Sequence, residues 1–355
     1  MTTNFSPFAV SVHLRADAQA RQSFVVVLGA SFEALPAHAL RVATVQAALQ
    51  DVDVHYGAPD ASSVRYDADM ADYKSAVDFV VNGHAHAPEG AMAGRVAVGI
   101  DVDGLLRKLL SISGDRFWRG GSLGRTASAP KAFRTMPLVY ERAFGGSSAA
   151  GHDPANPVGL GLAGVASADP QVQSEVPNVE HIEGGKGSTP AGFGFISRAW
   201  APRLAHAGSY DEEWLAKQFP LIPHDFDLRF NQAAPLDQQL ASIGGGEMVR
   251  VLNMTPEGQW IFRLPRLDVP MRLRYGDGVI DSPMRIDTVL LEPDLHRIVL
   301  RARARVAVRR LAAPLEEVVF GHATPAWWLA RVSRKIYWSG PGRDGRAPGT
   351  ACWRE

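Results

Sequence analysis

Residues 296–308 read His-Arg-Ile-Val-Leu-Arg-Ala-Arg-Ala-Arg-Val-Ala-Val, and from Leu300 onward basic and apolar side chains alternate. Successive side chains of a β-strand point to opposite faces of the sheet, so this period of two predicts a strand. One face of that strand would carry Arg301, Arg303 and Arg305. Two explanations for such a row stay open: carboxylates of neighbouring strands neutralise it, or it binds an acidic surface of another chain.

Other short apolar runs occur on both sides of the chain's centre. They are residues 24–28, 77–81, 96–102, 105–112, 247–252, 260–264, 269–275 and 288–291. Runs rich in β-branched residues and bounded by turn residues indicate strands. Asn82-Gly83 predicts a hairpin turn after the second run. Residues 37–50 also tolerate helical spacing, and Pro325 begins a segment of helical character. We expect a mainly β fold of antiparallel, sandwich-like sheets with few helices.

The middle of the chain has a different composition. Residues 145–208 contain 12 glycines and 6 prolines and show no apolar period, yet Phe193 and Trp200 lie among them. Disordered segments are poor in such large apolar residues. We therefore expect a long, ordered, Gly/Pro-rich coil inserted between the strands.

These patterns predict how the chain is organised. Residues 1–310 would form one β-rich domain. Its parts would be strands over 1–136, a coil-rich block over 137–240 and further strands over 241–310. Residues 311–355 would form a C-terminal extension that can contain a short helix.

Composition argues against several classes of protein. Among 355 residues, 37 basic side chains balance 37 acidic ones, so the net charge gives no reason to expect nucleic acid or anionic lipid as a partner. The single cysteine, Cys352, excludes a disulfide scaffold and a zinc finger. No stretch approaches the ~18 apolar residues of a membrane span. The first residues show no secretion signal. We expect a cytoplasmic protein without metal or cofactor.

Charge is unevenly distributed along this neutral chain. Residues 51–89 contain eight acidic and two basic side chains, whereas residues 295–355 contain twelve basic and four acidic ones. Faces of opposite sign would attract a partner or a second copy of the chain. A solvated surface explains the same asymmetry, so both interpretations stay open.

Three glycine-containing motifs resemble functional ones. Gly120-Gly-Ser-Leu-Gly124 fits the nucleophile elbow of hydrolases, with Ser122 as nucleophile, but Pro130 interrupts the helix that must follow. Residues 159–164 fit the dinucleotide fingerprint but lack the strand that must precede it. Residues 184–187 lack the Ser/Thr that follows the lysine of a phosphate loop. Turns are the simpler interpretation of all three.

Histidines and carboxylates also give no clear site. His84-Ala-His86 could present two imidazoles on one strand face, which is half of a metal site, although a strand end before Pro88 explains it as well. Asp225 and Asp227 show no spacing that selects an acid/base pair. We expect no catalytic and no metal-binding residues.

Residues 137–238 contain unusual strings of sequence. They are Pro137-Leu-Val-Tyr-Glu-Arg-Ala-Phe-Gly-Gly146, Asn156-Pro-Val-Gly159, Val176-Pro-Asn-Val-Glu180, Pro190-Ala-Gly-Phe-Gly194, Trp200-Ala-Pro-Arg203, Tyr210-Asp-Glu-Glu-Trp214 and Asp225-Phe-Asp-Leu-Arg-Phe-Asn231 running on to Gln238. In their order they resemble a family of uncharacterised accessory proteins encoded in bacterial type VI secretion clusters. The resemblance extends from about residue 20 to 300. It departs at Lys74-Ser75, where the family pattern has Lys-Pro.

Members of that family lie beside toxic effectors and PAAR-repeat tip proteins, and are thought to load an effector onto the secretion spike. The resemblance implies a non-enzymatic adaptor or chaperone. Its partners would be a toxic effector, a PAAR-repeat protein or a valine-glycine-repeat spike protein. Two rival hypotheses are a hydrolase that uses Ser122 and a structural component of the secreted spike.

Two sets of residues are candidates for the functional surface. Aromatic and arginine side chains anchor many protein interfaces. The candidates for partner binding are therefore Arg301, Arg303, Arg305, Phe193, Trp200, Tyr210 and Trp214, with packing of the coil onto the β core as the alternative for the aromatic ones. Structural ion pairs, caps and contacts are expected for Tyr140, Glu141, Arg142, Phe144, Gly145, Asn156, Asp225, Asn231, Asp237 and Gln238.

Overall fold

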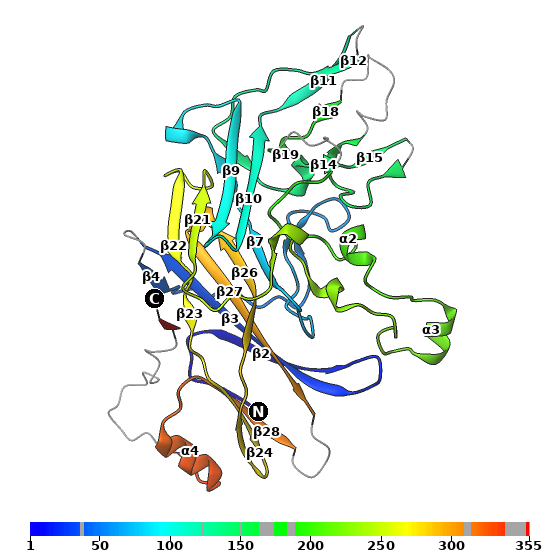
Figure 1. Ribbon diagram of the computed structural model, residues 1–355. Helices are drawn as coiled ribbons and strands as arrows, with labels where there is room; N and C mark the ends of the chain where they lie inside the picture. Colours follow the sequence, from blue (N-terminus) through cyan, green and yellow to red (C-terminus); the bar gives the residue numbers. More distant parts are fainter. Residues whose placement is uncertain are drawn as a thin grey trace.

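The computed structural model describes residues 1–35, 39–121, 124–149, 151–162, 174–182, 189–308, 314–337 and 353–354. Strands make up 43% of it and helices 11%, and the sheets are mostly antiparallel (Figure 1). The predicted mainly β fold with few helices is therefore confirmed. No helix within the described ranges has both the length and the apolar character needed to cross a lipid bilayer.

The largest sheet, called the large sheet below, has seven strands. Their order is β2 (Ala9–Ala16), β3 (Gln22–Ala34), β27 (Arg297–Ala307), β26 (Arg285–Glu292), β7 (Val77–Val81) and β20 (Gln239–Leu240), and β4 (Leu40–Val42) also pairs with β3. All neighbours are antiparallel except β26 and β7, which are parallel. Strands from both ends of the chain therefore meet at the centre of one sheet.

Two further sheets complete the framework. The five-stranded sheet has the order β19 (Val179–His181), β10 (Leu106–Ser113), β9 (Arg95–Val102), β21 (Met248–Leu252) and β22 (Gln259–Arg263). The four-stranded sheet has the order β1 (Thr2–Asn4), β28 (Leu315–Phe320), β24 (Met271–Tyr275) and β25 (Gly278–Asp281). Strand β28, which follows residue 310, lies between β1 and β24 and so pairs with strands from both earlier parts of the chain.

The remaining strands are short, and five of these thirteen lie in the coil-rich block. A three-stranded sheet contains β12 (Gly124–Ala127), β11 (Arg116–Gly121) and β18 (Glu175–Val176). The two-stranded pairs are β13 (Thr135–Pro137) with β8 (His84–His86), β14 (Phe144–Gly145) with β17 (Leu160–Gly161), β15 (Ser147–Ser148) with β16 (Gly151–His152), β23 (Arg266–Leu267) with β29 (Trp353–Arg354), and β5 (Val54–His55) with β6 (Val64–Tyr66).

Three short α-helices occur in the described part of the chain. They are α2 (Ala201–Leu204), α3 (Glu212–Lys217) and α4 (Pro325–Val332). Helix α4 begins where Pro325 indicated helical character, and the Thr324 side chain caps it by accepting a bond from the Trp327 amide. The 3-10 turns are η2 (Pro88–Gly90), η3 (Tyr140–Arg142), η4 (Leu228–Asn231), η5 (Leu236–Gln238) and η6 (Pro293–Leu295). In Figure 1, α2 and α3 lie beside the sheets, and α4 lies near β24 and β28.

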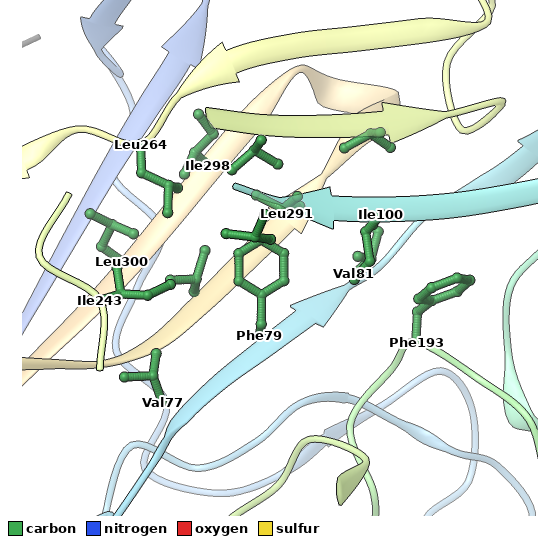
Figure 2. Packing of buried hydrophobic residues seen from close by; sticks show 14 of the residues in the cluster. Val77, Phe79, Val81, Ile100, Phe193, Ile243, Leu264, Leu291, Ile298 and Leu300 are labelled. Atoms are coloured by element: carbon green, nitrogen blue, oxygen red, sulfur yellow. The ribbon is translucent and has the colours of Figure 1, made fainter. Parts of the chain in front are cut away.

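One apolar core joins the sheets. Alternate residues of the large sheet, such as Phe79 and Leu300, cluster with Ile100 of the five-stranded sheet and Leu273 of the four-stranded sheet. Figure 2 shows Phe79, Leu300 and Ile100 converging from their different strands. The side of the large sheet that faces this core is called the inner face below. Its period-two pattern is the alternation expected when one face of a strand is packed on the core.

The opposite side of the large sheet, the outer face, is covered by coil. Val80, Leu290 and Val299 on this face form a second, smaller cluster with Phe195 and Ala233 of the coil-rich block. The described part of the coil around Phe195 and Ala233 therefore packs against the sheet as a layer, and residues 150, 163–173 and 183–188 of the expected coil lie outside the described ranges. This position explains why large apolar residues occur in a segment without an apolar period.

One local expectation is wrong, and one local alternative is not observed. Asn82-Gly83 does not join a hairpin, because β7 pairs with β26 and β20 whereas β8 pairs with β13. The Asn82 amide continues the pairing by donating to the Leu291 carbonyl. The helix considered for residues 37–50 is also absent over the described residues 39–50, where β4 is followed by coil.

Candidate functional site

The arginine row of β27 is neutralised inside the chain. Arg301 and Arg303 are only 8% and 6% exposed. The Arg301 Nε donates to Asp69 Oδ1 over 3.0 Å, and the Arg303 Nε donates to Asp287 Oδ2 over 2.6 Å. Arg303 also donates to the carbonyls of Asp69 and Ala71. The proposed contact of Arg301 and Arg303 with a partner is therefore corrected: both side chains lie between the sheet and the coil.

The acidic segment 51–89 covers this outer face, which accounts for much of the uneven charge. Five of its eight carboxylates form ion pairs within the chain. These pairs are Asp53–Arg198, Asp67–Arg203, Asp69–Arg301, Asp72–Arg15 and Asp78–Lys74. Arg305 remains one-third exposed and lies 3.5 Å from an Asp17 oxygen. Among these five pairs, only Asp69–Arg301 joins the acidic segment to the basic segment 295–355, and the other four carboxylates pair with cations elsewhere in the chain.

Asp78 fastens the coil to the outer face. Its buried carboxylate accepts bonds from the Lys74 ammonium at 2.7 Å, the Gln232 side chain at 2.9 Å, and the amides of Ala233 and Ala234 at 2.9 and 3.1 Å. Burial alone would disfavour the charged form of Lys74, but the surrounding carboxylates raise the pKa of this lysine above its ordinary value. A fully paired cluster of this kind holds the coil in one position.

Two of the predicted partner-binding aromatic residues are buried. Phe193 is 0% exposed and Trp200 is 5% exposed. The Trp200 ring packs edge-on against Tyr140, with centroids 5.4 Å apart. Gly192 lies so close to Tyr140 that a Cβ there would come within 2.7 Å of the ring. Phe193 and Trp200 pack the coil onto the core, which was the alternative considered for them.

The turn η3 places Glu141 and Arg142 in polar contacts. The Glu141 carboxylate accepts from the amide and the hydroxyl of Ser63 at 2.8 and 2.7 Å. Arg142 donates to Asp115 at 3.2 Å and to Asn178 at 3.1 Å. The Arg142 side chain is about one-third exposed, so it lies at the rim of the coil layer and not within it.

The next strings of the coil meet at Asn156. Its buried amide donates to the carbonyls of Tyr140 and Phe144 at 2.8 and 2.9 Å. Gly145 has a φ of 144° and its α-carbon faces Asn156 without space for a Cβ. Buried Phe144 and Gly145 pair with β17 as the short strand β14.

Asp225 and Asn231 hold turns near the end of the block. The Asp225 carboxylate accepts from the Ser209 amide and hydroxyl at 3.0 and 2.8 Å. These bonds lower the pKa of Asp225 below its ordinary value. The Asn231 amide donates to the Tyr73 carbonyl at 2.9 Å. Both side chains therefore bind the backbone or side chains of loops that have no sheet partner.

The other two aromatic candidates form an exposed lobe around α3. Tyr210 is 55% exposed, and its ring lies 4.8 Å from that of Trp214. Trp214 packs in turn against Phe219, with centroids 5.6 Å apart, and its indole donates to the Leu221 carbonyl. Figure 1 shows this lobe projecting beside the sheets. Tyr210 is thus exposed to solvent, whereas Trp214 is partly buried between Tyr210 and Phe219.

A pocket of about 750 Å³ opens within the same block. Its lining comes from η3, α2, η4, η5 and the coil between them, together with single residues of β10, β19 and β20. The lining residues are Lys108, Tyr140, Ala155, His181, Pro190, Gly192, Ile196, Pro202, Arg203, His206, Arg229, Gln232, Ala234, Pro235, Leu236, Asp237 and Gln239. All but Lys108 belong to the coil-rich block, so the strings that are far apart in sequence surround one hollow.

Lys108 supplies a buried cation to this pocket. Its ammonium donates to Asp237 at 2.9 Å and to Gln238 at 2.7 Å, and lies 5.4 Å from the centre of the Phe193 ring. Gln238 is itself fixed, because its amide donates to the carbonyls of Phe79 and Phe193 at 2.6 and 3.1 Å. Burial lowers the pKa of Lys108 below its ordinary value, although Asp237 opposes this change.

The sequence interpretation missed Lys108, although a signal was present. In the run 105–112, Lys108 shares the period-two face of Leu106, Leu110 and Ile112. These three apolar residues are buried in the core. An ionisable residue on an otherwise apolar strand face needs a partner, and such a position marks a candidate site.

The two histidines of β8 bind one carboxylate. His84 Nδ1 lies 2.8 Å from one oxygen of Asp294, and His86 Nε2 lies 3.2 Å from the other. The hydrogen bond to Asp294 raises the pKa of His84 above its ordinary value. The structure contains no cluster of three or more metal-ligating side chains within its described ranges.

Other motifs lie wholly or partly outside the described residues. Ser122 of the elbow motif is outside them, as are the last residues of the 159–164 motif and the whole of 184–187. The hydrolase alternative that uses Ser122 is therefore untested by the geometry.

The comparison with protein families gives one match. Residues 19–303 match the model of a family described as an uncharacterized protein conserved in bacteria, DUF2169. This range contains the whole coil-rich block, the strands β3, β7 and β26 of the large sheet, and most of β27. No curated protein and no solved structure matches the chain.

Proposed function

The chain belongs to this bacterial family, DUF2169, and we propose that it is a non-enzymatic adaptor of type VI secretion. In this proposal it binds a toxic effector or a PAAR-type tip protein in the cytoplasm and helps to load it onto the spike. The resemblance of its sequence strings to those of accessory proteins of secretion clusters supports a role in type VI secretion. The chemistry of the pocket supports binding of a protein partner.

The observation on which the proposal rests is the convergence of the coil-rich block on one hollow. Coil fixed by buried polar contacts, such as those of Asp78 and Asn156, presents a preformed surface. A preformed surface loses little conformational freedom on binding. The wall of the pocket combines apolar groups such as Tyr140 and Pro202 with charged groups such as Lys108. Mixed surfaces of this kind are typical of interfaces that form and separate.

Co-purification with the neighbouring toxin tests the proposal. The tagged chain is co-expressed with the effector or PAAR-type protein encoded beside its gene, and the complex is isolated and its Kd measured. Leu236 lines the pocket and is 85% exposed, so Leu236→Arg changes the surface without entering the core. We expect this variant to weaken binding by about tenfold.

Two matched variants locate the contact. Leu329 on α4 is 70% exposed, and Leu329→Arg should leave binding unchanged. Leu215 on α3 is 62% exposed, and loss of binding in Leu215→Arg alone would place the partner on the α3 lobe instead. Absence of any complex with the wild-type chain, or export of the chain with the tip, would contradict the adaptor role.

A further inference from the structure

The pocket lining contains more basic than acidic side chains. Its lining contains Lys108, Arg203, Arg229, His181 and His206, against a single carboxylate, that of Asp237. Arg203 and Arg229 are each neutralised by a carboxylate outside the lining, so the positive charge available to a ligand depends on Lys108.

Lys108 differs from Arg203 and Arg229 in where its carboxylate partner lies. Arg203 pairs with Asp67 and Arg229 pairs with Asp227, and neither of these carboxylates is among the lining residues. Lys108 instead pairs with Asp237 at 2.9 Å. The Lys108 side chain is 6% exposed, whereas that of Asp237 is 55% exposed. The Lys108 ammonium is therefore buried in the pocket wall, whereas the Asp237 carboxylate is exposed to solvent.

Gln238 keeps the cation in place when that partner changes. Its Oε1 accepts from the Lys108 ammonium at 2.7 Å while its amide is bonded to two buried carbonyls. The ammonium is thus positioned independently of Asp237. A fixed, largely desolvated cation forms a stronger bond with a carboxylate than a solvated one does.

The remaining wall suits an extended chain. Tyr140, Ile196, Pro190, Pro202 and Pro235 provide apolar contact area around the cation. A volume of about 750 Å³ accommodates a short peptide segment and not a folded element.

We infer that this pocket binds a short, extended, acidic segment of the protein partner, and that a carboxylate of that segment replaces Asp237 at the Lys108 ammonium. Asp237 thus occupies the site as an internal competitor while the chain is free. The inference rests on the proposed adaptor function and adds the chemistry of the recognised segment.

A synthetic peptide tests this chemistry directly. The probe is a fluorescent, acetylated and amidated peptide in which glutamate alternates with proline and leucine, and its Kd is measured by anisotropy. Lys108→Met should weaken binding by about tenfold to a hundredfold, because a charged hydrogen bond is lost. Asp237→Asn should tighten binding by about two- to fivefold, because the competitor is removed.

Matched controls separate this result from general attraction of anions. Lys217 and Glu213 form an exposed pair on α3, and Lys217→Gln should leave the Kd unchanged. The same peptide with glutamine in place of glutamate should bind at least tenfold more weakly. Equal binding of both peptides, equal competition by inorganic phosphate, or no tightening in Asp237→Asn would overturn the inference. Because Asp237 is exposed, its variant decides the question even if Lys108→Met does not fold.

The partner itself distinguishes the two proposals. If the neighbouring toxin binds wild type, Lys108→Met and Asp237→Asn equally well, the adaptor role stands and the acidic-segment inference is wrong. If no toxin or tip protein binds the wild-type chain, the adaptor role is wrong, and the peptide measurement still decides the chemistry of the pocket.

Discussion

On the inner face of the large sheet, Ile298 and Leu300 of β27 belong to the apolar core; on the outer face, Arg301 and Arg303 of the same strand bind Asp69 and Asp287. Apolar burial is roughly proportional to area and has no required direction, so the inner face tolerates changes that conserve volume. Buried ion pairs need one geometry and one partner each. The outer face therefore determines where the coil lies, and the inner face supplies most of the cohesion.

We expect the largest loss of stability from reversal of one buried charge on the outer face. Arg303→Glu places a carboxylate beside Asp287 and removes donors from two backbone carbonyls. We expect a loss of at least about 3–5 kcal/mol in the free energy of unfolding, measured with urea.

Arg305→Glu is the matched control, because Arg305 lies on the same face but is one-third exposed. It should cost no more than about 1 kcal/mol. Equal stability of the two variants would show that the buried contacts of Arg303 with Asp287 and with the coil carbonyls stabilise the fold no more than an exposed pair does.

Substitution of a glycine in the coil tests how tightly the coil packs compared with the apolar core. In Gly192→Ala, the new methyl group would meet the buried Tyr140 ring at 2.7 Å. We expect a loss of about 1–3 kcal/mol in thermal or urea unfolding, as in an overpacked core. Gly244→Ala is the control, since the nearest atom to its Cβ would be 4.0 Å away. If Gly192→Ala leaves the stability unchanged, the coil accommodates an added methyl group more readily than a packed core does.

The smallest expected effect is a dependence of stability on pH at β8. The pKa of His84 is raised above 6.5 by Asp294 in the folded chain. The stability from this pair is therefore complete below about pH 6.5 and is lost as the pH rises through the folded pKa. Because the pair is half-exposed, the change should be below about 1 kcal/mol.

His84→Gln and Asp294→Asn should each flatten this slope in melting curves recorded between mildly acid and mildly alkaline pH. The double variant should add nothing further, since both changes remove one interaction. A slope that persists in Asp294→Asn would assign the dependence to another group.

Strand positions could be predicted because they depend on local pattern. The run 77–81 is β7 without change of bounds, and the alternating run 296–308 contains β27. Alternation and β-branching act over a few neighbouring residues, so the sequence by itself determined the mainly β class and the separation of arginine and apolar faces on β27.

Only the tertiary structure decided which atoms meet each face. Nothing near Arg301 in sequence indicates that Asp69 pairs with it, because the two residues are 232 positions apart. The same holds for Lys108 and Asp237, which are 129 positions apart and meet only when the coil-rich block folds over β10. Phe193, Trp200, Tyr210 and Trp214 are aromatic residues of one block, yet two are buried and two lie on the α3 lobe. Local pattern specifies what a residue prefers, whereas burial and pairing depend on contacts between distant segments, which exist only after the chain has folded.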